Sequence, residues 1–360
     1  MKFVHIADVH LDMPFTTLSN RTGVGELRRI EQREAMKKVI EYIKENQIPY
    51  LFIAGDLYEQ EYIRESTIQY INSLFKEIPN TKIFITPGNH DPYLKNSFYN
   101  QYHWNENVHI FSEKLEKIEL LDCNIYGFGF EDYYLKNKDI LNIRIEDNKA
   151  INILITHGSL DAGSEVEREY NPLNKRELKM LGMDYIALGH IHKPYYNEEE
   201  NQRIVYPGSL ISLGFDELGK HGMMVGEIEK GKIELDFIPI DTKEFVEKEI
   251  DITPCADVEE CIGLLNELLL EDNKYYKISL IGKRKFEINI YQILKNVINK
   301  NIIKIKNDTT IYYDIENASK EINLKGLFIK EIKNKMGEGK INKELLEKTL
   351  EIGLEIFDKK

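Results

Sequence analysis

Short apolar runs that end on metal-ligating side chains dominate the first 192 residues of this chain. Each run is bounded by glycine or polar residues, which is typical of a buried β-strand. The five runs are residues 3–7 before Asp8 and His10, 51–55 before Asp56, 83–88 before Asn89 and His90, 153–156 before His157, and 186–189 before His190 and His192. Because open α/β sheets bind ligands at the carboxyl ends of their strands, we expect these side chains to converge in one crevice of one sheet.

The donor set is large for a single ion. Two aspartates, one asparagine and four or five histidines supply too many oxygen and nitrogen donors for one metal, so the pattern predicts two. One Asp-x-His motif or one histidine after a strand is more often a hydrogen-bonded polar residue than a ligand. Five such motifs in this order, each after a strand, form a specific pattern that indicates metal-assisted hydrolysis of a phosphate ester.

Length and composition bound the remaining choices. A chain of 360 residues is long enough for one large domain and one smaller domain. No apolar run approaches the roughly 18–20 residues that cross a bilayer, so we expect no membrane association. The three cysteines, Cys123, Cys255 and Cys261, lie outside the ligand runs and are too few for a disulfide framework. A reducing, cytoplasmic compartment is therefore expected.

The net charge of −13 argues against broad affinity for nucleic acids, which usually requires a basic surface. The charge is unevenly distributed, because residues 245–360 hold 20 Lys+Arg against 21 Asp+Glu. This segment, which includes Lys283, Arg284 and Lys285, is therefore the better candidate for contacts with a phosphate backbone.

Apolar periodicity predicts helices over residues 26–46 and 61–77, between the first three strands. Strand–helix alternation implies right-handed crossovers and a largely parallel sheet. Three later segments, 203–206, 223–229 and 232–240, predict strands of a second, more antiparallel sheet packed on the first. We expect a linker near 241–254, followed by alternating helices and strands. The fold class is therefore α/β, with a two-sheet, sandwich-like core flanked by helices in residues 1–244 and a smaller C-terminal α/β cap domain in residues 245–360.

The five motifs together resemble those of the calcineurin-like metallophosphoesterases. Further segments are similar to the DNA-repair exonuclease branch of that family, the SbcD-type nucleases and their YhaO-like relatives. These segments are residues 8–15, 184–194, 205–210 and 241–246. The resemblance covers about residues 1–255, whereas the C-terminal segment matches only in position and size.

The resemblance implies one metal held by Asp8, His10, Asp56 and His192, and a second held by Asp56, Asn89, His157 and His190. Mn²⁺ is the expected metal, and the same ligands suit Fe or Zn²⁺. Asp56 would bridge the two ions, and a hydroxide between them would attack the phosphorus in line. His90 has no metal assignment and is the expected catalytic residue, as general acid or as a stabiliser of transition-state charge. Asp91 is expected to orient His90 or, alternatively, to cap the following turn.

The resemblance also implies a DNA exonuclease or endonuclease in DNA repair that works with an SMC-like ATPase carrying a coiled coil. Apolar residues after position 320, such as Leu324, Leu327, Phe328, Leu346 and Leu350, suit a partner-binding helix, although closing the small domain explains them as well. Two alternatives remain: a phosphoesterase acting on cyclic nucleotides, small phosphodiesters or phosphoproteins, and an inactive scaffold for an ATPase. A homodimer is also left open. Tyr133 and Tyr134 could stack on bases, but we interpret them as ordinary surface residues.

Overall fold

The computed structural model describes residues 1–18, 21–136, 140, 143–196 and 203–358. The chain divides into two compact units. The first unit consists of residues 1–246 with 272–275, and the second of residues 247–271 with 276–360. Among the helices described, none is both long enough and apolar enough to cross a bilayer.

The first unit contains a six-stranded sheet with the order β11-β10-β1-β2-β3-β4. Its strands are β1 (Lys2–Ile6), β2 (Tyr50–Ala54), β3 (Lys82–Thr86), β4 (Val108–Ile110), β10 (Gly222–Glu229) and β11 (Lys232–Pro239). Strands β1 to β4 run parallel to one another, whereas β10 is antiparallel to β1 and β11 is antiparallel to β10.

A five-stranded sheet with the order β5-β6-β7-β8-β9 forms the other half of this unit. It consists of β5 (Glu116–Glu119), β6 (Cys123–Gly127), β7 (Ile151–His157), β8 (Tyr185–Gly189) and β9 (Ile204–Val205). Only β5 is antiparallel to its neighbour. The prediction that the late strands build a second, antiparallel sheet is therefore wrong for β10 and β11. The predicted strand at 203–206, observed as β9, does lie in the second sheet, but it runs parallel to β8. Strands β10 and β11 extend the first sheet, because β10 pairs with β1 at the other end of the unit's sequence, a relation that apolar periodicity does not encode.

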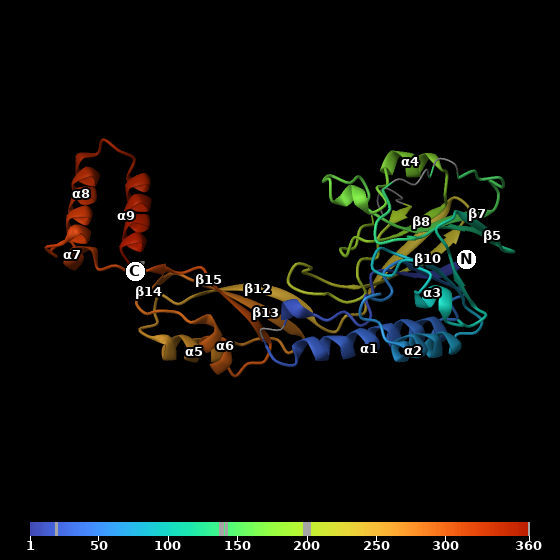
Figure 1. Ribbon diagram of the computed structural model, residues 1–360, viewed down its shortest axis with the longest axis horizontal. Coiled ribbons are helices and arrows are strands. Elements are labelled where there is room, and N and C mark those ends of the chain that lie inside the picture. Colours follow the sequence, from blue (N-terminus) through green and yellow to red (C-terminus); the bar gives the residue numbers. More distant parts are fainter. Residues whose placement is uncertain (19–20, 137–139, 141–142, 197–202, 359–360) are drawn as a thin grey trace. The chain divides into compact units, whose positions relative to one another are not determined.

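The two sheets bury a shared aromatic and aliphatic core. Phe52 and Phe84 of the first sheet belong to one cluster with Ile125, Ile155 and Tyr185 of the second, and all five are at most 2% exposed. Helices α1 (Val24–Glu45) and α2 (Glu65–Lys76) lie side by side in this unit (Figure 1) and connect the parallel strands. The predicted α/β class, with two sheets flanked by helices, is confirmed.

Shorter elements complete the first unit. The 3₁₀ helices are Thr16–Leu18 and Glu167–Glu169, and the short α-helices are α3 (Phe98–Gln101) and α4 (Lys175–Met180). Leu178 of α4 packs with Leu154, Ile186 and Leu188 in a second core cluster. The buried guanidinium of Arg28 on α1 donates to the Asp241 carboxylate just after β11, with an Nη2–Oδ2 distance of 2.9 Å. This ion pair ties the end of β11 to α1.

The second unit is built around a three-stranded sheet of β12 (Glu244–Asp251), β13 (Lys274–Ile281) and β15 (Ile302–Asn307), with a small pair of β14 (Lys283–Arg284) and β16 (Thr310–Ile311). Its helices are α5 (Val258–Asn266), α6 (Ile290–Asn296), α7 (Ile315–Ala318), α8 (Leu324–Glu338) and α9 (Lys343–Asp358). Residues 244–251, which we predicted as part of a linker, form strand β12. The prediction missed it because Phe245 and Ile250 are its only buried apolar side chains.

Helices α8 and α9 lie side by side (Figure 1) and share a small core that includes Ile329, Leu346 and Leu350. Leu324 and Leu327 are instead 71% and 61% exposed. Some of the apolar residues after position 320 therefore form the core of this hairpin, and others face outward.

Candidate metal centre

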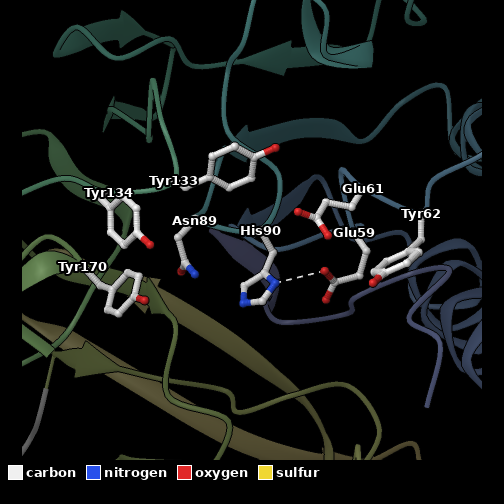
Figure 2. Close-up of a pocket in the computed structure, with 8 residues that line it drawn as sticks. All are labelled: Glu59, Glu61, Tyr62, Asn89, His90, Tyr133, Tyr134 and Tyr170. Atoms are coloured by element: carbon white, nitrogen blue, oxygen red, sulfur yellow. Dashed lines mark hydrogen bonds and ion pairs between the residues drawn. The ribbon is translucent and has the colours of Figure 1, made fainter. Parts of the chain in front are cut away.

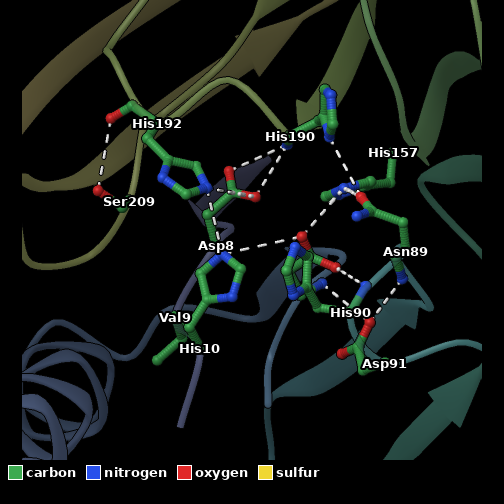
Figure 3. A network of polar contacts seen from close by, with 12 residues as sticks. Asp8, Val9, His10, Asn89, His90, Asp91, His157, His190, His192 and Ser209 are labelled. Carbon is green, nitrogen blue, oxygen red and sulfur yellow. Dashed lines mark hydrogen bonds and ion pairs between the residues drawn. The ribbon is translucent and has the colours of Figure 1, made fainter. Parts of the chain in front are cut away.

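The predicted ligands lie together although they come from two sheets. Asp8 and His10 follow β1, Asp56 follows β2 and Asn89 follows β3, all in the first sheet. The remaining ligands are His157 at the end of β7 and His190 and His192 after β8, in the second sheet. Figure 3 shows the labelled ligands pointing toward one another: Asp8, His10, Asn89, His157, His190 and His192. The convergence we predicted is present, but the crevice lies between two sheets and not at the edge of one.

Four of these residues have an unusual backbone. Asp8 and His10 have φ of 51°, Asp56 has φ of 53° and His190 has φ of 106°. Non-glycine residues with positive φ typically cost on the order of 1–3 kcal/mol each and cluster at functional sites. Backbone bonds hold two of these turns, from the Asp8 amide to the Gly55 carbonyl at 3.1 Å and from the His10 amide to the Asp56 carbonyl at 2.9 Å. The strained turns redirect the side chains from the strands into the crevice.

Close packing requires glycine at position 88, immediately before Asn89. A Cβ atom on Gly88 would lie 2.2 Å from Asp56 Oδ1, much closer than van der Waals contact. Gly88 therefore lets the turn after β3 pass directly over the Asp56 carboxylate. In this position the amide of His90 donates to Asp56 Oδ1 at 2.8 Å.

The donor atoms gather around two points. At the first, His10 Nε2 lies 3.2 Å from His192 Nε2, and His192 Nε2 lies 3.9 Å from Asp8 Oδ1. At the second, His157 Nε2 and His190 Nδ1 both face Asn89 Oδ1, at 3.0 and 3.2 Å.

Asp56 stands between these two points. Its Oδ2 lies 3.8 Å from His10 Nε2 and 3.3 Å from His157 Nε2. One carboxylate thus faces a histidine of each group, which is the position a bridging ligand requires.

The donor set fits two divalent cations. Buried carboxylate and imidazole donors, with no thiolate among them, suit borderline and hard divalent metals. Burial lowers the pKa of His190 to about 3. Ligand atoms of Asp8 also lie within 4.8 Å of those of Asp56 and His157. The assignment of each residue to one ion therefore stays a prediction.

Glu59 is a site residue that the sequence analysis missed. Its Oε1 lies 2.7 Å from His10 Nδ1 and its Oε2 lies 3.0 Å from His90 Nδ1. Burial opposes the charged form of His90, but the hydrogen bond to Glu59 raises the pKa of His90 to about 9. One carboxylate therefore orients both a predicted ligand and the predicted catalytic residue. The only sequence signal is its place three residues after Asp56, too weak to single it out.

Asp91 does not orient His90, so that prediction is wrong. The Asp91 carboxylate is buried, and its described hydrogen bonds go to groups other than the His90 ring. Its Oδ1 accepts from the amides of Gly88 at 2.6 Å and Asp56 at 3.0 Å, and its Oδ2 accepts from the Leu57 amide and the Tyr99 hydroxyl, both at 2.6 Å. Asp91 thus fixes the backbone that carries Asp56. The role predicted for Asp91, orienting His90, belongs to Glu59.

Glu217 is a second missed residue. Its Oε1 lies 2.5 Å from His192 Nδ1, and its other oxygen accepts from Ser209 Oγ at 3.1 Å. Ser209 also bonds His221 Nδ1 at 2.8 Å. Burial lowers the pKa of His192, but the hydrogen bond to Glu217 raises it to about 9. Glu217 lies in a loop without a motif, and only the fold brings it to His192.

A pocket of about 510 Å³ opens beside the metal centre (Figure 2). Asn89 and His90 form its inner wall. The other described residues that line it are Glu59, Glu61, Tyr62, Tyr133, Tyr134 and Tyr170. Tyr133 and Tyr134, which we interpreted as ordinary surface residues, therefore border the predicted catalytic residue.

Comparison with known proteins agrees with this arrangement. The profile of the family described as calcineurin-like phosphoesterase matches residues 1–194. An uncharacterized metallophosphoesterase of Bacillus subtilis (strain 168), YhaO, is 29% identical over 246 residues, which cover 66% of this chain and 60% of the relative. The match thus leaves a large part of that relative's length unaligned.

Two solved structures resemble this chain weakly, each at 10% identity. A protein of Thermus thermophilus, TT1561, has a TM-score of 0.38 and covers 66% of this chain and 98% of its own. A dimetal phosphatase from Danio rerio has a TM-score of 0.40 and covers 67% of this chain and 96% of its own. Likenesses at this level do not bear on function.

Proposed function

The chain belongs to the calcineurin-like phosphoesterase family. From this premise we propose that it is a metal-dependent phosphodiesterase that cleaves DNA. It would use two divalent cations, with Mn²⁺ as the expected metal. The observation that carries the proposal is the place of Asp56. Its carboxylate faces His10 on one side and His157 on the other, so one residue joins two groups of metal-ligating atoms. This arrangement suits a two-metal hydrolase, in which the bound cations activate water and neutralise phosphate charge.

The chain's own residues have distinct roles in this proposal. Asp8, His10 and His192 would hold one metal, and Asn89, His157 and His190 would hold the other. The scissile phosphate would bind between them. His90 is the proposed catalytic residue, because its half-exposed ring borders the pocket. One of its ring nitrogens also lies within 4.8 Å of ligand atoms of His10 and Asp56, so the proton donor would stand directly beside the metals. Glu59 holds Nδ1 of His90, which leaves Nε2 to donate a proton to the leaving oxygen.

Support for DNA as the substrate comes from the second unit and from the similarity to the repair-nuclease branch. Lys283 on β14 and Lys285 just after it are exposed. Lys306 near the end of β15 is also exposed and pairs with Asp308 at 3.0 Å. Such side chains can neutralise backbone phosphates.

A second candidate, hydrolysis of small phosphodiesters, is favoured by the pocket itself. Its volume of about 510 Å³ suits a small molecule, and Glu59 and Glu61 would repel the further phosphates of a polymer.

Hydrolysis assays with purified full-length protein separate these candidates. We expect linear DNA and bis-p-nitrophenyl phosphate to be hydrolysed with Mn²⁺ and to be protected when a chelator removes it. Rapid turnover of dinucleoside phosphates or cyclic nucleotides with intact DNA would select the small-substrate candidate. Stoichiometric metal binding without turnover of any phosphodiester would contradict both candidates and favour the inactive scaffold.

We further propose an ATPase partner with a coiled coil that docks on the α8–α9 hairpin. Leu324, Leu327 and Leu345 are 71%, 61% and 59% exposed, which leaves apolar surface after the hairpin core is formed. Co-purification from native lysate should recover an ATPase with the wild type and not with a Leu324→Glu, Leu327→Glu variant. Recovery of no ATPase with the wild-type chain would refute the partner.

A further inference from the structure

Four tyrosines border the pocket beside the metal centre, and we call them the tyrosine wall: Tyr62, Tyr133, Tyr134 and Tyr170 (Figure 2). Tyr62, Tyr133 and Tyr134 are 51%, 37% and 53% exposed. Single exposed aromatic side chains are common on protein surfaces, but here several line one pocket. Their position next to Asn89 and His90 places them within reach of any group attached to a phosphate at the metal centre.

Part of this wall forms a continuous aromatic ladder that starts at a predicted metal ligand. The Tyr170 ring lies 5.2 Å from the His190 ring at an interplanar angle of 34°. The Tyr134 ring follows at 5.9 Å and 31° from Tyr170. These tilted rings lead from the metal centre outward, and the exposed Tyr134 is the outermost of the three.

The backbone holds the ladder in place. Leu135 donates to the Glu169 carbonyl at 2.9 Å and accepts from the Asn171 amide at 2.6 Å, so the segments carrying Tyr134 and Tyr170 are paired. The Ser159 amide donates to the Tyr170 carbonyl at 3.0 Å. A stacking surface that is already ordered loses little conformational entropy when it binds a ligand.

The charge of the pocket restricts what can occupy it. Glu59 and Glu61 lie on the other side of His90 from Tyr134 and Tyr170 (Figure 2), and no lysine or arginine is among the described residues that line the pocket. A phosphate group would therefore be held at the metal centre and not in the pocket. What fits between Tyr134 and Tyr170 on one side and the two carboxylates on the other is an uncharged planar group that can donate hydrogen bonds.

We propose that the tyrosine wall is a nucleobase subsite that receives one base next to the scissile phosphate. The proposal rests on the proposed function, because it takes the substrate's phosphate to be bound at the metal centre. A volume of about 510 Å³ is of the size that small-molecule sites have. Stacking on aromatic side chains tolerates any base, and Glu61 can accept from the amino groups of adenine, cytosine or guanine.

The test compares two ligands that share a phosphate and differ in the base: deoxyadenosine 5′-monophosphate and deoxyribose 5-phosphate. Equilibrium binding to the full-length protein with Mn²⁺ is measured for both. We expect the nucleotide to bind about 5- to 150-fold more tightly, the range that corresponds to one stacked base. Tyr134→Ala should remove most of this difference and Tyr134→Phe should retain it. Tyr291→Ala is the matched control, because Tyr291 is 75% exposed on α6.

Equal affinity for the two ligands, or no measurable binding of the nucleotide, would overturn the subsite. A preference that survives Tyr134→Ala unchanged would also overturn it. The readout is binding, so it is independent of catalysis: a protein that binds the nucleotide through Tyr134 but hydrolyses no phosphodiester keeps the subsite and loses the proposed function.

A catalytic measurement complements the binding test. Dinucleoside phosphates that lack one base at a time are compared for kcat and KM. Removing the base that occupies the wall should raise KM in the wild type and have little effect in Tyr134→Ala. If KM in the wild type is unchanged both when the first base and when the second base is removed, no base is bound by the wall and the proposal fails.

Discussion

The carboxylate of Glu59 lies 3.0 Å from Nδ1 of His90, the proposed catalytic residue. The same carboxylate holds His10 through its other oxygen. The orientation of the proposed proton donor is therefore coupled to that of a proposed metal ligand through one side chain. Partners of this kind fix the tautomer and the direction of a ring, which a distance criterion on the ligands alone does not reveal.

Replacing His90 should separate catalysis from metal binding. We expect His90→Ala to retain both metals and to lower kcat by about 10²–10⁴, the usual contribution of general acid–base catalysis. Elemental analysis and turnover of bis-p-nitrophenyl phosphate measure the two properties. Because Glu59 holds His90 as well as His10, the comparison is made at saturating Mn²⁺, where Glu59→Gln should lower kcat much less in the His90→Ala background than in the wild type. A His90→Ala protein that loses a metal would show that His90 is a ligand.

Replacing Asp56 should affect both metals at once. Asp56→Asn removes a negative charge that faces His10 and His157, so we expect one metal or none per chain and no activity with Mn²⁺. Metal content by elemental analysis and turnover check this together. Asp236→Asn, at an exposed position of β11, is the matched control and should change neither. Two bound metals with full activity in Asp56→Asn would rule out the bridging role.

Replacing Glu217 should weaken only one metal. Glu217 holds His192 and none of the other predicted ligands among the described contacts, so Glu217→Gln should weaken one of the two sites. Loss of such a hydrogen-bond partner typically lowers metal affinity by about 10–100-fold. Competition with a graded series of chelators gives the two affinities. Glu119→Gln, at an exposed position of β5, should leave both unchanged, and an equal loss at both sites in Glu217→Gln would contradict the assignment.

His5 should make the metal-free protein less stable in acid. Burial lowers the pKa of His5 to about 3, whereas the unfolded chain has the ordinary value of 6.5. Between these values the unfolded state takes up a proton and the folded state does not. The free energy of unfolding therefore falls as the pH decreases below 6.5, by up to about 1.4 kcal/mol per pH unit for this group. At higher pH both states are neutral and the contribution is constant.

Urea unfolding of the wild type and His5→Gln at several pH values, with chelator present, measures this effect. The difference between the two free energies of unfolding should shrink as the pH is lowered from 7.5 to 5. The exposed His103 provides the control, because His103→Gln should follow the wild type at every pH. A constant difference between the wild type and His5→Gln would contradict the prediction.

The sequence alone determined the local features of this protein. Apolar runs ending on Asp, Asn and His located β1, β2, β3, β7 and β8 and the residues that follow them, because strand periodicity and donor chemistry are properties of neighbouring residues. The helices α1 and α2 were predicted within a few residues for the same reason. The segment 244–251 was missed because a strand with few buried apolar side chains lacks that signal.

Tertiary structure decided every relation between distant segments. It placed β10 and β11 on the first sheet, moved the crevice between two sheets, and assigned Glu59 and not Asp91 to His90. It also brought Glu217 to His192 and set Tyr134 on Tyr170 beside the metal centre. These relations depend on how loops close over strand ends and on which strands pair across the chain. Such contacts join residues far apart in sequence, where neither periodicity nor motif spacing carries information.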